Sequence, residues 1–524
     1  MDRGQRLNRR AFLRRSFQMG TIAAGSATLV NCGGNTVVVS PTTTSTLGPV
    51  TSAEWLQLGS SLSGRLVVPT SASYQFDRLL YNSRFNDLHP RAIAFCASPD
   101  DVARCVTFAR ERGIAVAARS GGHSYGGYSN STGIVVDVSL MSAISVDTTS
   151  HRATVGAGAR LIDVYNVIGQ SGRLLPGGTC PTVGIAGLAL GGGIGVFGRK
   201  YGLTADNIES LRVVMADGKK VTANAGEHSD LWWAAQGGGG GNFGVVTSFT
   251  FRTQPMPEVA LFTLQFPWVA AMELLHGWQQ WMVITPDELW SSCEFLSQGT
   301  AGLLAQVSGV YCGSAGDLAV QLRSLIQLAG STPTSQFVGA RNYLDAMKYE
   351  AGCADLTIAS CHLTSQFARG HLSREAYAAK STYVKSSLGA NEVTRYVHAI
   401  ERFASEAPYL GGALAFDAYG GAINRIAADQ TAFVHRDSVA CIQATCSWTS
   451  ASSIGEVRAG HEWLRWLSAN VFDASTGAYQ NYIDPTLVGW ADAYYGANLP
   501  RLQQIKSKYD PDNFFKFAQS IAPA

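Results

Sequence analysis

The sequence lacks an excess of charge of either sign, because 40 Lys and Arg residues stand against 38 Asp and Glu residues in a chain of 524. A densely charged partner such as a nucleic acid is therefore not indicated. Cysteine and histidine never occur with the Cys-x-x-Cys or His-x-x-x-His spacing of structural zinc sites, so we predict no metal. No glycine run continues into Lys-Ser or Lys-Thr, and none opens a helix after an N-terminal strand, which disfavours nucleoside triphosphates and nicotinamide cofactors.

The sequence is rich in hydrophobic residues and in glycine. Hydrophobic residues make up 46% of the chain, which is enough for large cores in more than one folded unit. The 56 glycines follow no collagen-like period and cluster in loops. Glycine lets a backbone approach a ligand closely and point its N–H groups at phosphate or ring oxygens. This composition indicates an enzyme that cradles its ligand with backbone.

Residues 1–32 have the pattern of a twin-arginine export signal. Asn8-Arg-Arg-Ala-Phe-Leu-Arg14 precedes an uncharged stretch, 17–30, that is too short and too rich in Gly, Ala and Ser to span a membrane. Leu29-Val-Asn-Cys32 resembles a lipoprotein processing box, although its asparagine departs from the small residue expected before the cysteine. We expect export by the twin-arginine route, either as a free periplasmic protein or as a lipoprotein anchored to the membrane through Cys32.

Two glycine-rich segments carry the clearest chemical signal. They are Arg119-Ser-Gly-Gly-His123-Ser-Tyr-Gly-Gly and Gly178-Thr-Cys180-Pro-Thr-Val-Gly-Ile-Ala-Gly187, and each places one nucleophilic side chain among glycines. Either segment alone is typical of an ordinary loop. Three more segments follow in order: Leu190-Gly-Gly-Gly-Ile-Gly195, Gly202-Leu-Thr-Ala-Asp206-Asn207 and Gly237-Gly-Gly-Gly-Gly-Asn-Phe-Gly244-Val-Val. Together they indicate a flavin site.

In this combination the chain resembles the berberine-bridge-enzyme-like oxidases, a branch of the vanillyl-alcohol-oxidase superfamily of flavoproteins. The resemblance implies one FAD bonded twice to the protein, at its 8α position to His123 and at its 6 position to the sulfur of Cys180. The other cofactor-binding residues that it implies are Arg119, Ser120, Gly121, Gly122, Ser124, Gly126, Val183, Gly184, Gly187, Gly191, Gly195, Asp206, Asn207, Gly244, Val246 and Asn481.

Tyr479-Gln-Asn-Tyr482-Ile-Asp resembles the C-terminal signature of the same family, which supplies a tyrosine as the base that takes the alcohol proton. Side chains alternate along a strand, so a strand here would point Tyr479 and Tyr482 to opposite faces and let one reach the substrate. We expect that one to be Tyr482. A free tyrosine has a pKa of about 10, so its neighbours must favour the phenolate. Gln443 resembles the Glu or Gln beside the base and is expected to orient substrate.

The predicted fold class is α+β with two domains, a PCMH-type FAD-binding domain and a substrate-binding domain with an antiparallel sheet and covering helices. Residues 33–80 are assigned to a linker and lead-in, 81–255 to the FAD-binding domain and 256–470 to the substrate-binding domain. The prolines of Thr253-Gln-Pro-Met-Pro257 mark the boundary. Residues 471–524 resemble the family segment that returns to complete the FAD-binding domain.

Several local elements follow from pattern. Residues 92–96 and 114–118 are expected to be strands on either side of a helix that Ser98 caps. On a helix at 268–283, Trp278 and Trp281 are expected to pack in the core and not to stack on a sugar.

A core of this size does not need disulfides, so we expect most of the other cysteines to be buried thiols. These are Cys96, Cys105, Cys293, Cys312, Cys353, Cys361, Cys441 and Cys446.

The resemblance implies an oxidase that moves hydride from an alcohol or sugar hydroxyl to flavin N5 and returns the electrons to O₂ as hydrogen peroxide. The substrate is then a small molecule or an oligosaccharide. Val183, three residues after Cys180, is expected at the flavin edge that O₂ approaches, where a small residue is typical of the oxidases. Two alternatives stay open: a dehydrogenase that reduces a quinone or other carrier, and a tethered carbohydrate-binding protein with a vestigial flavin.

Overall fold

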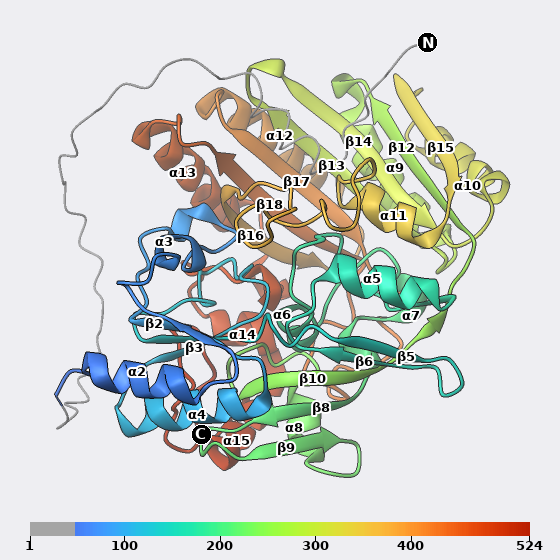
Figure 1. Cartoon of the computed structure of the whole chain (residues 1–524). Coiled ribbons are helices and arrows are strands. Elements are labelled where there is room, and N and C mark those ends of the chain that lie inside the picture. Colours follow the sequence, from blue (N-terminus) through green and yellow to red (C-terminus); the bar gives the residue numbers. More distant parts are fainter. Residues whose placement is uncertain (1–47) are drawn as a thin grey trace.

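The computed structural model describes residues 48–524 (Figure 1). The predicted export signal and the Cys32 processing box lie outside these residues, as do residues 33–47 of the predicted linker. Within the described residues, no helix combines the length and the apolar character that crossing a membrane demands.

The first half of the described chain forms two sheets, drawn in the lower part of Figure 1. The order β1-β2-β4-β3 joins β1 (Arg65–Val67), β2 (Ala92–Phe95), β4 (Ile134–Asp137) and β3 (Val116–Arg119). The antiparallel order β5-β6-β10-β8-β9 joins β5 (Ile144–Asp147), β6 (Arg152–Gly156), β10 (Val245–Arg252), β8 (Ile208–Val214) and β9 (Lys220–Asn224). A small ribbon pairs β7 (Arg173–Leu174) with β11 (Gln254–Pro255).

The helices of this half are α2 (Ser52–Ser61), α3 (Tyr74–Asp77), α4 (Pro99–Glu111), α5 (Leu161–Gln170), α6 (Ile185–Leu190), α7 (Gly198–Tyr201) and α8 (Ser229–Ala234). The strand, helix and strand predicted from residue 92 to residue 118 are confirmed as β2, α4 and β3. Helix α4 begins as expected, because the Ser98 hydroxyl accepts a hydrogen bond from the Asp101 N–H. The Asp101 carboxylate in turn accepts from the backbone N–H groups of Ser63 and Ala97, which ties the lead-in residues to the helix.

The second half is an antiparallel sheet of seven described strands in the order β15-β12-β14-β13-β17-β18-β16, drawn in the upper part of Figure 1. Its strands are β12 (Val259–Phe266), β13 (Leu289–Gln298), β14 (Leu303–Tyr311), β15 (Ser335–Arg341), β16 (Ala376–Val384), β17 (Gly411–Ala418) and β18 (Ala440–Trp448). Its helices are α9 (Ala271–Ile284), α10 (Ala315–Leu328), α11 (Tyr343–Glu350), α12 (Ala390–Glu406) and α13 (Ile454–Asn470).

The two faces of this sheet differ in polarity. Phe416 on β17 is in edge contact with Trp278 of α9 and with Tyr396 of α12, so its face of the sheet is apolar and covered by helices. Trp278 and Trp281 are both buried on α9, which confirms the expectation that they pack in the core. The opposite face carries buried polar residues, among them Ser292 and Glu294 on β13 and Gln443 on β18.

The C-terminal segment returns to that first half, where α15 (Leu499–Tyr509) contacts α8 and lies below β10 in Figure 1, and α14 (Trp490–Tyr495) contacts α15. This segment contains a fully buried ion pair between Lys506 and Asp510. Lys506 Nζ also donates to the backbone carbonyls of Asn242 and Phe515, at 2.6 and 2.7 Å. The ammonium charge is therefore balanced by one carboxylate and further satisfied by two carbonyl oxygens.

The strand predicted at Tyr479–Tyr482 is wrong. The backbone N–H of Tyr482 donates to the carbonyl of Tyr479 and closes a turn, so residues 480–482 form the short 3₁₀ helix η6 (Gln480–Tyr482). Residues three apart lie on the same side of such a turn. The two tyrosine rings accordingly touch, with their centroids 4.8 Å apart, instead of pointing to opposite faces.

The other described 3₁₀ helices are η1 (Ser83–Phe85), η2 (Ala205–Asn207), η3 (Trp268–Ala270), η4 (Gly299–Ala301), η5 (Ala474–Thr476) and η7 (Gly496–Asn498).

Most of the cysteines are buried thiols, as expected from the sequence. Cys353 and Cys361 form a disulfide in the connection between α11 and β16. The six other cysteines of that set are buried thiols. A short covalent loop thus braces a connection that has little regular structure of its own.

Candidate active site

A cavity of about 400 Å³ lies where the two halves of the chain meet. One wall comes from the His123 and Cys180 loops and from the C-terminal segment around Tyr482. The other wall is the polar face of the seven-stranded sheet, with residues of β13, β17 and β18. A concave site between folded units, with a few polar groups converging on it, is typical of cofactor and substrate binding.

The two nucleophiles of the glycine segments meet in this cavity. The Cys180 sulfur lies 3.9 Å from His123 Nδ1, and His123 Nε2 lies 2.9 Å from Thr182 Oγ1. Tyr81 stacks on the imidazole, with ring centroids 4.1 Å apart. One ring in the cavity could therefore contact both nucleophiles.

Strand β3 delivers the chain directly into the His123 loop, whereas α5 positions the Cys180 loop. The first backbone N–H groups of α5, at Leu161 and Ile162, donate to the carbonyls of Val183 and Pro181, both at 3.0 Å. These N–H groups have no partner inside their own helix, so the loop satisfies them. These two hydrogen bonds hold the Cys180 loop against the first turn of α5.

Glycine is required where the two loops touch. A Cβ atom on Gly121 would lie 2.2 Å from the backbone nitrogen of Gly184, and a Cβ on Gly184 would lie 2.1 Å from Ser120 Oγ. Any side chain at either position would push the loops apart. Gly187 differs, because an added Cβ would meet no protein atom within 4 Å there and would extend into the cavity.

Most of the predicted cofactor-binding residues line the cavity. Besides the two nucleophiles these are Arg119, Ser120, Gly121, Gly122, Ser124, Val183, Gly184, Gly187, Gly195, Gly244, Val246 and Asn481. The structure does not bring Gly126, Gly191, Asp206 or Asn207 into the lining. Gly191 instead makes room for a neighbour, since a Cβ there would lie 2.0 Å from Asn481 Oδ1.

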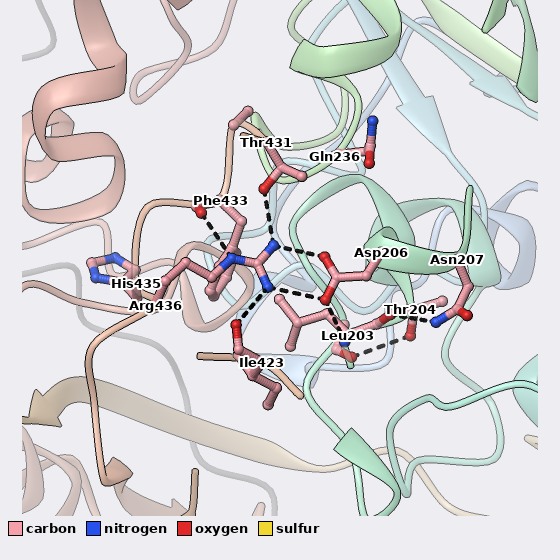
Figure 2. A network of polar contacts seen from close by, with 12 residues as sticks. Leu203, Thr204, Asp206, Asn207, Gln236, Ile423, Thr431, Phe433, His435 and Arg436 are labelled. Atoms are coloured by element: carbon pink, nitrogen blue, oxygen red, sulfur yellow. Dashed lines mark hydrogen bonds and ion pairs between the residues drawn. The ribbon is translucent and has the colours of Figure 1, made fainter. Parts of the chain in front are cut away.

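Asp206 serves a different purpose, which Figure 2 shows. Its carboxylate accepts two hydrogen bonds from the Arg436 guanidinium, at 3.0 and 2.6 Å, and both side chains are buried. Arg436 also donates to Thr431 Oγ1 and to the carbonyl of Ile423. Asp206 therefore fastens the connection between β17 and β18 to the first half of the chain, because a buried guanidinium needs a carboxylate partner.

Asn207 is likewise engaged with protein atoms. Its side-chain amide donates to the carbonyl of Leu203 at 2.9 Å, and its side-chain oxygen accepts from Gln254 Nε2 at 2.9 Å. Neither residue of the Asp206–Asn207 pair therefore has its polar atoms turned to the cavity as the sequence had led us to expect.

The two candidate tyrosines have different surroundings. The Tyr479 hydroxyl accepts hydrogen bonds from the backbone N–H groups of Gly193 and Ile194, at 3.0 and 3.1 Å. Burial raises the pKa of Tyr479 to about 12, which makes it a poor base at neutral pH. Tyr482 is only partly buried and stacks on Tyr125, with centroids 5.2 Å apart. Tyr482 is thus the better placed of the two to meet a substrate.

Gln443 lies on β18 in the cavity wall, and its side-chain amide donates to the Tyr125 hydroxyl at 2.9 Å. Since Tyr125 stacks on Tyr482, Gln443 orients the ring that supports the tyrosine. It also remains within the wall that a substrate would contact.

Sequence reasoning missed the polar residues of β13 and β17. Ser292 and Glu294 alternate with the apolar Cys293 and Phe295, so they face the cavity, and Asp417 lies directly opposite Ser292 on the neighbouring strand. The sequence of β13 carried only a partial signal, because Ser291 and Ser297 are polar on the face opposite to Ser292 and Glu294. It could not reveal which face meets a ligand.

Four buried polar atoms in the cavity lining have no hydrogen-bond partner within the described part of the chain. They are Arg119 Nη1 and Gln480 Oε1 on the first wall, and Trp290 Nε1 and Ser292 Oγ on the sheet wall. Leaving a buried polar atom unpaired costs roughly 1–3 kcal/mol, so such atoms are expected to bond a ligand. Their positions on both walls, together with the glycine backbone, fit a large polar cofactor and a second polar molecule.

Comparison with known proteins agrees with this site. Residues 90–224 match the model of an FAD binding domain, and residues 478–522 match the model described as berberine and berberine like. An uncharacterized FAD-linked oxidoreductase of Bacillus subtilis is 34% identical over 467 residues, which span 88% of this chain and 97% of that protein. The chain belongs to the berberine-bridge-enzyme-like family of FAD-linked oxidoreductases. Its cofactor is therefore FAD.

Two further relatives are informative, one for its solved structure and one for its named activity. The solved structure of BBE-like 1 from Physcomitrella patens matches with a TM-score of 0.80 and 30% identity, over 90% of this chain and 99% of that one. This confirms the α+β, two-domain PCMH-type fold. The glucooligosaccharide oxidase of Sarocladium strictum is 30% identical over 512 residues, which cover 91% of this chain and 97% of that enzyme.

The Asp206–Arg436 pair gives a prediction about how the cavity is held. Replacing Arg436→Met leaves a buried carboxylate without its cation, so we expect a loss of about 3–5 kcal/mol of stability. The matched control is Arg425→Met, which breaks the more exposed Arg425–Asp287 pair and should cost less than about 1 kcal/mol. Urea unfolding followed by flavin fluorescence measures both. Equal losses in the two variants would contradict the role given to Arg436.

Proposed function

We propose that this protein oxidises a hydroxyl group of a saccharide, with FAD bonded to both His123 and Cys180 and with O₂ as the electron acceptor. The observation that carries the proposal is the union, in one cavity, of two nucleophiles 3.9 Å apart, a tyrosine and a polar sheet face. The named activity of the related glucooligosaccharide oxidase supports the sugar hydroxyl as the reacting group.

The polar sheet wall also supports a saccharide. Burying hydroxyl, amide and carboxylate groups against an apolar ligand would leave them unbonded at considerable cost. Ser292, Gln443, Thr445 and Ser447 all line this wall. A ligand covered with hydroxyl groups can both donate to and accept from such side chains.

When bound at the His123 and Cys180 loops, FAD would supply a hydride acceptor for the substrate C–H bond and a donor of electrons to O₂. The remaining steps fall to the chain itself. Tyr482 takes the proton of the substrate hydroxyl, while Gln443 holds Tyr125 against it. Tyr479 fixes the loop at Gly193 through its hydroxyl, which keeps the wall behind Tyr482 in place.

The attachment can be tested by denaturation. Flavin should stay with the acid-precipitated wild-type protein, because covalent bonds survive unfolding. The His123→Ala and Cys180→Ala variants should each keep flavin through the remaining bond, and the double variant should release it. Absorbance of the supernatant measures the release, and free flavin from the wild type would refute covalent attachment.

The role of Tyr482 can be tested by stopped-flow reduction. Tyr482→Phe should slow reduction of the flavin by substrate about 10²- to 10⁴-fold, the usual contribution of a general base, with FAD still bound. Tyr479→Phe serves as comparison and should mainly lower thermal stability, since its hydroxyl accepts hydrogen bonds from the backbone N–H groups of Gly193 and Ile194 and from the Asn481 side chain. An unchanged reduction rate in Tyr482→Phe would place the base elsewhere.

The electron acceptor can be tested at Val183, which lines the cavity three residues after Cys180. A valine leaves room for O₂ that an added methylene would fill, so reoxidation by air should be fast in the wild type and slower in Val183→Leu and Val183→Ile. Reduction by substrate should change little. Reduced wild-type enzyme that persists in air and is oxidised at once by a quinone would establish the dehydrogenase alternative instead.

We further propose export by the twin-arginine route, which carries folded proteins; it is supported by the Asn8–Arg14 motif and by a flavin that must be attached before export. Replacing Arg9 and Arg10 together by Lys should retain the protein, with its flavin, inside the cell. Cell fractionation measures where the protein is retained.

Labelling with a radioactive fatty acid that persists in Cys32→Ser would rule out that residue as the lipid anchor.

A further inference from the structure

The two nitrogen atoms of the His123 ring have different neighbours. Nδ1 lies 3.9 Å from the Cys180 sulfur, whereas Nε2 lies 2.9 Å from Thr182 Oγ1. Cys180 lines the cavity, but Thr182 is not part of the lining and is only 2% exposed. Nδ1 is therefore the ring nitrogen on the side of the cofactor site, and Nε2 is turned into the protein.

The backbone holds Thr182 in place on both sides. The first two N–H groups of α5 donate to the carbonyls of Pro181 and Val183, the residues before and after it, both at 3.0 Å. The Thr182 hydroxyl is consequently carried by a segment that is tied to a helix end. Such a hydroxyl can orient a neighbouring ring more precisely than one on an unsupported loop.

Tyr81 fixes the plane of the imidazole but not its orientation within that plane. The two rings stack with 17° between their planes, and the Tyr81 N–H donates to the Gly122 carbonyl at 3.0 Å. A half-turn of the His123 side chain about its Cβ–Cγ bond would keep this stacking and exchange ring nitrogens for ring carbons. The hydrogen bond from Nε2 to Thr182 excludes that half-turn, because it would place a carbon against the hydroxyl.

The same hydroxyl determines which nitrogen of His123 carries a lone pair. A neutral imidazole has one N–H and one lone pair, and the hydrogen bond made by one nitrogen decides the state of the other. With Nε2–H donating to Thr182 Oγ1, the lone pair is at Nδ1, which can then act as a nucleophile. Once Nδ1 is bonded to carbon, the lone pair lies at Nε2 and the hydroxyl can donate to it, since a hydroxyl both accepts and donates.

Packing alone does not account for a hydroxyl at this position. Valine has nearly the shape of threonine and would fill the space without a polar atom to satisfy. A buried hydroxyl is unfavourable unless it has a partner. The partner of the Thr182 hydroxyl is His123.

We propose that Thr182 is the positioning residue for the bond between His123 and FAD, and that it holds Nδ1 toward the flavin with the proton on Nε2. This inference rests on the double attachment proposed above. In the reaction Nδ1 forms a bond to the 8α carbon, that carbon loses one hydrogen as a proton, and Nε2 loses its proton. The electron pair of the broken C–H bond enters the flavin and passes to O₂, which takes up both protons and becomes H₂O₂.

The Cys180→Ala background isolates the His123 bond for the experiment. A host that requires riboflavin makes the protein without it, riboflavin is then added, and the flavin that stays with acid-precipitated protein is followed with time. Adding Thr182→Val should slow attachment at least about tenfold, because the reacting nitrogen is no longer held in place. Thr182→Ser keeps a hydroxyl and should restore most of the rate. The control Thr247→Val removes the hydroxyl of another buried threonine, bonded to the Arg212 carbonyl, and should leave the rate unchanged.

Proteolysis with Cys180 intact gives a second readout, which does not depend on how well the double variant folds. The wild type should yield a His123 peptide and a Cys180 peptide joined through one FAD, identified by mass. Thr182→Val should yield mainly FAD on the Cys180 peptide alone. A joined pair that forms as fast in Thr182→Val as in the wild type would overturn the proposal. An equal loss in Thr182→Ser would also overturn it, because the hydroxyl would then not be what matters.

This proposal and the double attachment fail in different ways. If Cys180→Ala with Thr182 intact releases all of its flavin on precipitation, no bond to His123 exists and the double attachment is wrong. If Cys180→Ala keeps its flavin and the added Thr182→Val change does not slow attachment, the double attachment stands and the role of Thr182 is overturned.

Discussion

The active site depends on the contact between two glycine loops. At Gly121 and Gly184 the backbones approach so closely that neither residue has space for a Cβ atom. This approach is what places the Cys180 sulfur 3.9 Å from the His123 ring. Glycine at these positions is therefore a steric requirement of the loop contact, in addition to any contact that the residues make with FAD.

Further contacts hold the rest of the chain against this pair of loops. The Tyr479 hydroxyl binds the backbone at Gly193 and Ile194 from the C-terminal segment. Arg436 reaches Asp206 from the connection between two strands of the second half. Segments that are remote in sequence thus close the cavity through buried, directional bonds, which fix a geometry more sharply than apolar packing does.

The two faces of the seven-stranded sheet have different roles. Residues such as Phe416 pack against helices and supply the core, whereas Ser292, Glu294 and Gln443 turn toward FAD-binding residues across the cavity. Because side chains alternate along a strand, stability and recognition are built into the same strands without interfering. A change of substrate needs new residues only at every second position of β13, β17 and β18.

The sequence by itself determined the features that depend on neighbouring residues. The Ser98 cap and the strands around α4 depend on neighbouring residues, so they could be predicted locally. The glycine motifs at His123 and Cys180 are continuous in the sequence, so the FAD-binding family could be predicted from them. Only the tertiary structure decided which side chains share the cavity. Asp206 matched a family motif but is bound by Arg436, 230 residues away.

The carboxylates of the sheet wall belong to no motif at all, because strand register, and not spacing along the chain, places Asp417 opposite Ser292. The tyrosine pair shows the same limit at short range, since one backbone hydrogen bond turned the expected strand at Tyr479 into a 3₁₀ helix. Local propensity is decided within a few residues, whereas a binding site is assembled by contacts whose partners the local sequence does not contain.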